Sequence, residues 1–268
     1  MKLAFSNIAW GPGEDNEVLD LLLAHGVKGI EVAPTRLWPN WDGATPEAAA
    51  AWARAMHQAG FQTPSLQSLL FGRPDLQVFG SSQQQTDLIT HLAHVAKLAA
   101  AMQAKVLVFG SPKNRDRGDL TPAQAMRRAI EFFRQAGQVC TDAGVTLAIE
   151  ANPSYYSCNF VTRWQEAEEL VRGCNHPGIG LHLDTACTVL AGDDPVAAVP
   201  QVADILVHVH ASEPDLGPFE RPRTDHQAVG DALRAVNYAG WCSVEMRRTS
   251  TALASLQQAA QLVARCYG

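Results

Sequence analysis

Short apolar segments alternate with longer amphipathic segments along the whole chain. Eight of the short segments have the length and composition of buried strands, and they span residues 3–9, 27–32, 63–69, 105–109, 145–150, 179–184, 205–210 and 242–246. The alanine- and leucine-rich segments between them have helical periodicity, as in residues 46–59, 84–101, 122–143 and 162–172. The pattern therefore predicts a repeated unit of one strand followed by one helix.

Residues typical of helix ends mark several of these boundaries. Thr45 and Thr121 each precede a proline at the first predicted helical position, where the missing N–H costs nothing. Thr162 and Gln165 have the spacing of a capping box. Glycines at positions 60 and 144 follow two of the predicted helices, as expected at a helix C-terminus.

Strict alternation of strands and helices predicts a parallel sheet, and eight repeats favour closure into a barrel. A single (β/α)8 TIM barrel typically needs about 250 residues, so we expect residues 1–268 to form one α/β domain of this kind. The N-terminal strand should then pair with the last strand. A Rossmann-type sheet is the rival fold, but no Gly-x-Gly-x-x-Gly follows any predicted strand.

The last four predicted strands each divide into two faces, because alternate residues of a barrel strand point inward and outward. The bulky apolar face should pack against the helices; in the seventh strand this division places Val207 outward and Leu206 inward. The inward face carries an ionisable residue at the carboxyl end of each strand. These four residues are Glu150, Asp184, His210 and Glu245.

Three carboxylates at one buried mouth would repel one another unless a cation balanced them. Two glutamates, one aspartate and one histidine suit Mn²⁺, and also Mg²⁺, Co²⁺, Fe²⁺ or Zn²⁺. Separate salt bridges are the usual interpretation of a single inward polar residue. Because four such residues share one register, we favour one divalent metal ion, with Mn²⁺ as the first expectation.

Composition narrows the class of protein. Hydrophobic residues make up 47% of the chain and charged residues 18%, which predicts a globular protein with a large core. With 27 acidic against 21 basic residues the net charge is -6, which argues against a nucleic-acid partner. We find neither a signal peptide nor an apolar run of about 18 residues, so no membrane association and a cytoplasmic location are expected. The six cysteines lack Cys-x-x-Cys spacing and are predicted to be buried thiols.

Four short motifs carry a resemblance to a known group of proteins. They are Ala148-Ile149-Glu150-Ala151-Asn152-Pro153, His182-Leu183-Asp184-Thr185, His208-Val209-His210 and Ser243-Val244-Glu245. In this order and spacing, the chain resembles the xylose isomerase-like TIM barrel superfamily, in particular its sugar phosphate isomerase/epimerase branch, which is D-tagatose 3-epimerase-like. The resemblance spans the whole chain and does not specify the substrate.

The resemblance implies that Glu150, Asp184, His210 and Glu245 bind the metal, and that Glu150 and Glu245 also form the acid/base pair. The expected function is isomerisation or epimerisation of a small sugar, ketose or sugar-like polyol by proton transfer through an enediolate. A bound ion lowers the barrier to that proton removal, and the two glutamates come from different sides of the barrel. The expected oligomeric state is a homodimer or a homotetramer.

The chain departs from the branch at two positions. Cys187 stands where a substrate-binding histidine usually follows the ligand aspartate, and no arginine closely follows the ligand histidine. Cys187 is therefore a candidate substrate contact. Arg221 and Arg223, farther along the same loop, are candidates to replace the missing arginine.

Four further inward residues have weaker assignments. His182 and His208 lie one layer beneath the expected ligands, so we expect hydrogen bonds to the ligands rather than direct coordination. Arg247 and Glu31 could contact substrate, with ion pairs at the barrel rim as the alternative. Gln67, near the end of the third strand, could line a sugar pocket.

Other functions stay open at this point. The same enolate could expel a β-hydroxyl, which would make the protein a metal-dependent dehydratase (a lyase) of a keto-cyclitol or sugar acid. An endonuclease IV-like phosphodiesterase would need more metal-binding histidines and a basic DNA-binding face, which the acidic balance argues against. A non-catalytic ligand-binding barrel is the last alternative, because fold alone does not define function.

Overall fold

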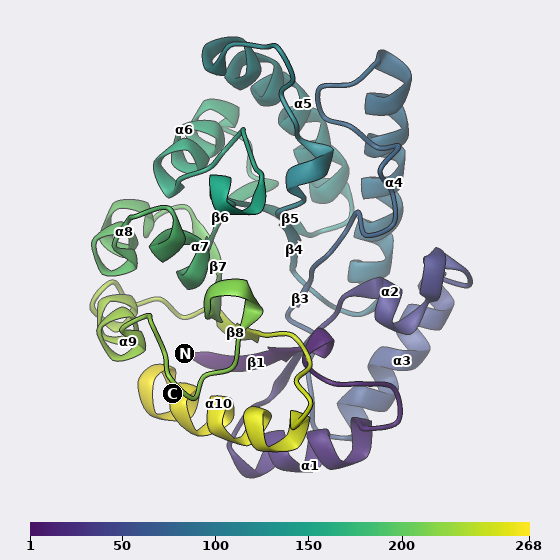
Figure 1. Ribbon diagram of the computed structural model, residues 1–268. Coiled ribbons are helices and arrows are strands. Elements are labelled where there is room, and N and C mark those ends of the chain that lie inside the picture. The colour runs from purple at the N-terminus through teal and green to yellow at the C-terminus, as the bar shows by residue number, and fades with distance from the viewer.

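The computed structural model describes residues 1–268, and its strands form a central sheet with the helices arranged around it (Figure 1). The eight strands are β1 (Lys2–Ser6), β2 (Gly29–Glu31), β3 (Ser65–Leu66), β4 (Val106–Phe109), β5 (Thr146–Glu150), β6 (Ile179–Asp184), β7 (Leu206–Ser212) and β8 (Trp241–Glu245). Every strand pair is parallel. The predicted (β/α)8 TIM barrel is confirmed.

The helices follow the strands in the predicted alternation. They are α1 (Asp15–Ala24), α2 (Pro34–Leu37), α3 (Pro46–Gln58), α4 (Ser82–Ala101), α5 (Pro122–Asp142), α6 (Trp164–Cys174), α7 (Thr185–Leu190), α8 (Pro195–Val202), α9 (His226–Ala235) and α10 (Ala252–Tyr267). Five single-turn 3-10 helices lie in the loops: η1 (Asn7–Ala9), η2 (Pro39–Trp41), η3 (Pro112–Asn114), η4 (Ser154–Tyr156) and η5 (Pro214–Leu216).

The barrel closes at two places in the strand order. β1 pairs with β8, with Ala4 opposite Ser243, as predicted for the N-terminal strand. β2 and β3, at the two ends of the order, meet through isolated bridges between Gly29 and Gln62 and between Val32 and Leu66. β3 is shorter than the predicted residues 63–69, because the backbone turns at Ser68 with a φ of 54°.

The apolar faces of the strands form the core together with the helices. Leu147, Ile149, Leu181, Leu183 and Val244 belong to one cluster of 64 buried residues that runs between the barrel and its helices. This face is the one that the alternating pattern assigned outward. The opposite, inward face is therefore free to carry the polar residues.

A β-bulge in β7 changes the expected faces at one point. Leu181 pairs with Leu206 and His182 pairs with His208, so Val207 is an extra residue between two aligned pairs. Val207 packs inside the barrel against Val106, Val108 and Ala148, whereas Leu206 joins the outer core. The outward assignment of Val207 was wrong, and the bulge restores the predicted inward direction from His208 onward.

Most of the helix-capping predictions are confirmed. The hydroxyl groups of Thr45 and Thr121 accept hydrogen bonds from backbone N–H groups at the starts of α3 and α5. The capping box predicted from Thr162 and Gln165 is wrong: α6 begins after Arg163, and Glu166 instead accepts a hydrogen bond from the backbone N–H of Thr162.

All six cysteines are buried, and none forms a disulfide. None of the helices combines the length and the hydrophobicity that a membrane span requires.

Candidate metal centre and substrate pocket

The four predicted ligands meet at the carboxyl ends of β5 to β8. Glu150, Asp184 and Glu245 are the last residues of β5, β6 and β8, and His210 pairs with Asp184 across β6 and β7. Glu150, Asp184 and His210 each offer a ligand atom within 4.8 Å of the others, and His182 belongs to the same close group. Glu245 lies next to this group: its Oε2 atom is 3.3 Å from Nδ1 of His210.

Asp184 is fixed by two hydrogen bonds from neighbouring segments. Its Oδ1 atom accepts a bond of 2.6 Å from the backbone N–H of Cys187, because Asp184 also caps the start of α7. Its Oδ2 atom accepts a bond of 2.8 Å from the hydroxyl group of Ser212. The carboxylate therefore has a set orientation in the site.

His210 is oriented from below by Glu31. The Nε2 atom of the ring lies 2.8 Å from Oε1 of Glu31, which leaves Nδ1 facing Glu245 and Asp184. Glu31 also binds His208 at 2.8 Å and the hydroxyl group of Ser65 at 2.6 Å. Partners of this kind fix the ring orientation of metal-binding histidines.

Burial and mutual repulsion perturb the two glutamates. Burial, together with the negative charges of Asp184 and Glu245, raises the pKa of Glu150 to about 8. Burial also raises the pKa of Glu245. Burial opposes the charged form of His210, but Glu31 and Glu245 outweigh it and hold the pKa of His210 well above its usual value. The site thus concentrates negative charge that a cation would stabilise.

A pocket of about 290 Å³ opens directly above these residues. It is lined by Gln67, Ser68, Val108, Gly110, Ser111, Pro112, Glu150, Asn152, Tyr156, Asp184, Ala186, Cys187, Leu216 and Glu245. No lysine or arginine is among the lining residues. The pocket therefore combines hydroxyl and amide groups with acidic groups and has no basic side chain for an anionic substituent.

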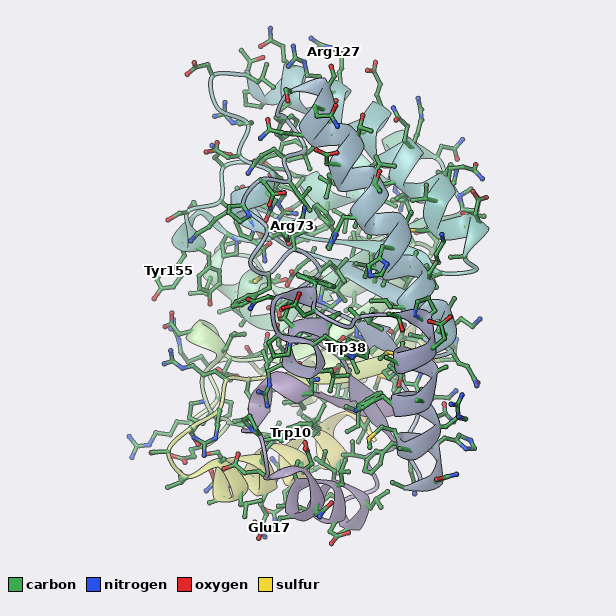
Figure 2. The ribbon with its side chains drawn as sticks, turned by 90° about the vertical axis from the view of Figure 1, so that its right-hand side faces the viewer. Trp10, Glu17, Trp38, Arg73, Arg127 and Tyr155 are labelled. Atoms are coloured by element: carbon green, nitrogen blue, oxygen red, sulfur yellow. The ribbon has the colours of Figure 1, made fainter.

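Two loops meet at the rim of this pocket. The hydroxyl group of Tyr155 lies 3.1 Å from the carboxylate of Asp215, and the hydroxyl group of Tyr156 accepts a hydrogen bond of 2.9 Å from the backbone of Asp215. Tyr155 is exposed and projects from the molecule in Figure 2. These bonds connect the loop after β5 to the loop after β7.

Only some of the residues predicted to contact the substrate line the pocket. Cys187 and Gln67 line the pocket, and burial raises the pKa of the Cys187 thiol well above its usual value, so the thiol stays protonated. Arg247 and Arg221 are exposed and do not line it, because Arg247 follows the end of β8 and Arg221 lies on an outer loop beside Glu213 and Asp215.

Glu31 is fully buried beneath His210, and its carboxylate is occupied by histidine and serine partners rather than directed into the pocket. His208 touches Glu31 and not the pocket. The hydrogen bond expected from His208 to a metal ligand is not formed: its Nε2 atom contacts Glu31, which also binds His210, and the hydroxyl group of Ser65. The substrate contact expected for Glu31 is wrong, because its carboxylate contacts His210 instead.

The sequence did not predict the contacts of Arg115 or of the side chain of Asn152, and the solvated position expected for Arg115 is wrong because its side chain is buried. The buried guanidinium group of Arg115 donates 2.7 Å hydrogen bonds to the backbone oxygen of Glu150 and to Oδ1 of Asn152. Asn152 must then direct its NH₂ group elsewhere, and that group lies 3.7 Å from Sγ of Cys187. The spacing Glu150-x-Asn152 is the only sequence signal that could have suggested this side chain.

Comparisons with known proteins agree with this geometry. The sequence matches the family described as xylose isomerase-like TIM barrel over residues 19–266. The chain belongs to this family. No curated protein sequence gives a significant match.

Solved structures with this fold cover nearly the whole chain at low sequence identity. A D-psicose 3-epimerase with D-tagatose, from Clostridium cellulolyticum H10, is 15% identical and has a TM-score of 0.81, covering 100% of this chain and 99% of its own. The IolI protein with a zinc atom is 16% identical, with a TM-score of 0.77 and coverage of 100% and 98%. The probable 3-DHS dehydratase AsbF from Bacillus anthracis is 14% identical, with a TM-score of 0.74 and coverage of 98% of both chains.

The residues present fit a divalent cation. The Nδ1 atom of His210 is buried and has no hydrogen-bonding partner within the protein, which is costly for a polar atom. Carboxylate oxygens and imidazole nitrogens are suitable ligands for several divalent ions. The cluster could therefore hold a metal, and its donor atoms do not by themselves define which one.

Proposed function

We propose that the protein is a divalent-metal-dependent isomerase or epimerase of a small sugar, ketose or sugar-like polyol. The observation that carries this proposal is the position of two perturbed glutamates, the buried Glu150 and the partly buried Glu245, at the floor of a small polar pocket beside Asp184 and His210. We infer that Glu150, Asp184, His210 and Glu245 hold the ion and that Mn²⁺ is the first ion to test. Several structurally similar proteins are named as 3-epimerases of D-psicose or L-ribulose, which supports a carbohydrate substrate.

The proposed division of labour follows from where the side chains start. Glu150 comes from β5 and Glu245 from β8, with β6 and β7 between them, so the two carboxylates reach the pocket from separated strands. One glutamate would remove the proton from the carbon next to a carbonyl, and the other would return a proton to the opposite face. A bound divalent ion would supply Lewis acidity to the carbonyl and hydroxyl oxygens of the substrate.

The pocket walls would hold the substrate in place. Asn152, whose oxygen is engaged by Arg115, offers N–H donors on the side of the pocket next to Glu150. Ser111 and Gln67 add polar groups that can bind sugar hydroxyls. The absence of basic residues from the lining favours an uncharged polyol over a phosphodiester.

The test is a screen of ketoses, keto-cyclitols and their phosphates in deuterated water, with the protein loaded with Mn²⁺, Mg²⁺, Co²⁺ or Zn²⁺. We expect an uncharged substrate to gain deuterium at the carbon next to its carbonyl and to yield an isomer of unchanged formula. A product lighter by one water molecule would instead identify a dehydratase. If no compound exchanges with any metal, the proposed function is wrong.

A further inference from the structure

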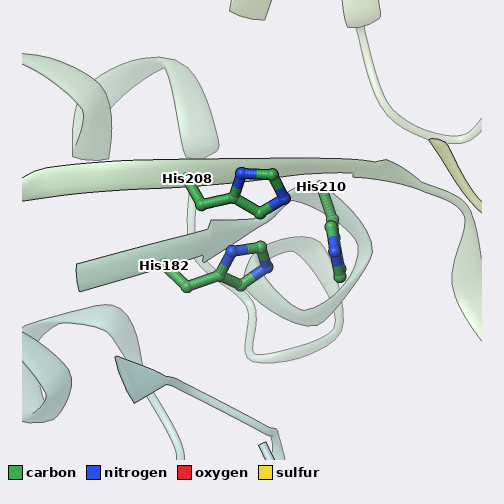
Figure 3. Close-up of side chains that lie close together, drawn as sticks. All are labelled: His182, His208 and His210. Atoms are coloured by element: carbon green, nitrogen blue, oxygen red, sulfur yellow. The ribbon is translucent and has the colours of Figure 1, made fainter. Parts of the chain in front are cut away.

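His182 lies in the barrel beneath the pocket and does not form the hydrogen bond to a ligand that the sequence predicted for it. It projects from β6 toward the same space as His208 and His210, which come from β7 (Figure 3). The ring centroids of His182 and His210 are 4.1 Å apart and nearly perpendicular. The Nε2 atom of His182 lies 4.0 Å from Oε1 of Glu150.

Neither ring nitrogen of His182 has a hydrogen-bonding partner within the protein, although its side chain is fully buried. His208, one strand away, has its Nε2 atom bound to Glu31 and within 3.2 Å of the hydroxyl group of Ser65. A buried polar atom without a partner is costly. His182 is the histidine of this group in which neither nitrogen has a partner, whereas His210 lacks one only at Nδ1. His182 is also not part of the Glu31 network.

The potential ligand atoms around His182 are close enough to converge on a single ion after small side-chain movements. Glu150, His182, Asp184 and His210 each place a ligand atom within 4.8 Å of the other three. Ligand bonds of about 2.0–2.2 Å allow donor atoms to lie roughly 3–4 Å apart. Glu245 is outside this close group, although it touches His210.

We propose that His182 is a direct metal ligand through its Nε2 atom, in addition to Glu150, Asp184, His210 and Glu245. This inference rests on the proposed metal site and adds one nitrogen donor to it. A second imidazole makes the ligand set softer, which favours Zn²⁺ or Co²⁺ over Mg²⁺.

The experiment counts histidine ligands on a bound ion and does not depend on catalysis. The purified protein is stripped of metal, loaded with one equivalent of Zn²⁺ and studied by X-ray absorption, where imidazole rings give distinct outer-shell scattering. The affinity for Zn²⁺ is measured in parallel by competition with a chelator. The variants are His182→Gln and Glu245→Gln. His226→Gln is the control for loss of a buried histidine that is not in the candidate ligand group and is bonded to Glu213 and Tyr267.

We expect two imidazoles in the native protein, one in His182→Gln, and two in Glu245→Gln and His226→Gln. Loss of an outer partner typically weakens metal binding about 10- to 100-fold, so loss of His182 should weaken it by more than about 100-fold. One imidazole in the native protein, with unchanged affinity in a folded His182→Gln variant, would overturn the inference and leave the proposed function intact. If the native protein binds no ion, the inference and the metal-dependent function both fail.

Discussion

The ring of His210 has a carboxylate at each of its two nitrogen atoms. Glu31 binds Nε2 at 2.8 Å, and Glu245 lies 3.3 Å from Nδ1. The histidines outweigh the burial that opposes ionisation of Glu31 and hold its pKa well below the usual value, so Glu31 stays charged. A charged acceptor at Nε2 fixes the ring and makes Nδ1 a stronger metal donor.

Replacing Glu31 with Gln should therefore weaken metal binding without touching a ligand. The amide has one acceptor oxygen, while the carboxylate of Glu31 serves both His208 and His210. We expect a loss of about 10- to 100-fold in Zn²⁺ affinity, measured by chelator competition. Glu213→Gln is the matched control, because Glu213 is also buried and bound to a histidine, His226, at 2.9 Å. Equal affinities for the Glu31 and Glu213 variants would show that the orienting contact has no effect.

Metal affinity should also rise with pH because protons occupy the site. Burial raises the pKa of Glu150 to about 8, so below that pH the metal-free protein holds a proton that the ion must displace. Each displaced proton makes affinity rise by about tenfold per pH unit, and the contribution of Glu150 should level off above pH 8. Calorimetry in buffers of different ionisation enthalpy measures the released protons. Glu150→Gln should release fewer, and pH-independent affinity in the native protein would contradict this account.

At the scale of strands and loops, the alternating pattern was enough to predict which strand faces carry Glu150, Asp184, His210 and Glu245. Inward direction follows directly from the period of a strand. The depth of a side chain along the barrel axis does not follow from this period, because it depends on where each strand ends relative to its neighbours. Glu31 was correctly placed on the inward face, but its position below His210 follows from the pairing of β2 with β1.

The sequence did not predict the irregular features of the structure, such as the β-bulge and the contacts between loops. The bulge at Val207 inserts one residue without any proline or glycine to mark it. Arg221 lies in a segment without periodicity, so its direction was not predictable. The alternating pattern placed Arg247 inward, but β8 ends at Glu245, and both arginines are exposed. Asn152 and Arg115 meet through a contact between two loops, which no local pattern indicates.

Close packing at the end of β4 gives a test at this scale. A Cβ atom at Gly110 would clash with Oε2 of Glu150, so the carboxylate would have to move in a Gly110→Ala variant. A displacement of about 1 Å can cost about 100-fold in turnover. We expect a folded protein with reduced metal affinity and reduced turnover on the substrate found by the screen, measured together with circular dichroism.

The same clash should be relieved by a shorter acid. The double variant Gly110→Ala with Glu150→Asp removes one methylene group from the side chain that meets the added Cβ atom. We expect it to recover part of the metal affinity lost in Gly110→Ala alone. If Gly110→Ala binds metal as tightly as the native protein, the position of Glu150 in the site is not as described.

In the whole molecule, the closed barrel brings together residues that are far apart in the chain: Glu150 and Glu245 are separated by 95 positions, and Ser243 and Glu31, which share a hydrogen bond, by 212. Pairing of β1 with β8 fixes the last strand against the first, with Ala4 opposite Ser243, so the position of Glu245 depends on closure. The fold was predictable from the repeated strand and helix pattern alone. The identity of the substrate was not, because the pocket walls come from loops.

In the proposed mechanism, Glu150 and Glu245 exchange protons with opposite faces of one substrate carbon. The measurement is NMR of deuterium incorporation into each of the two epimers of the substrate found by the screen, at saturating metal, for Glu150→Gln, Glu245→Gln and the double variant. We predict that each single variant exchanges one epimer without converting it to the other, that the two variants exchange opposite epimers, and that the double variant exchanges neither. Conversion of one epimer to the other at a near-native rate by either single variant would contradict the account.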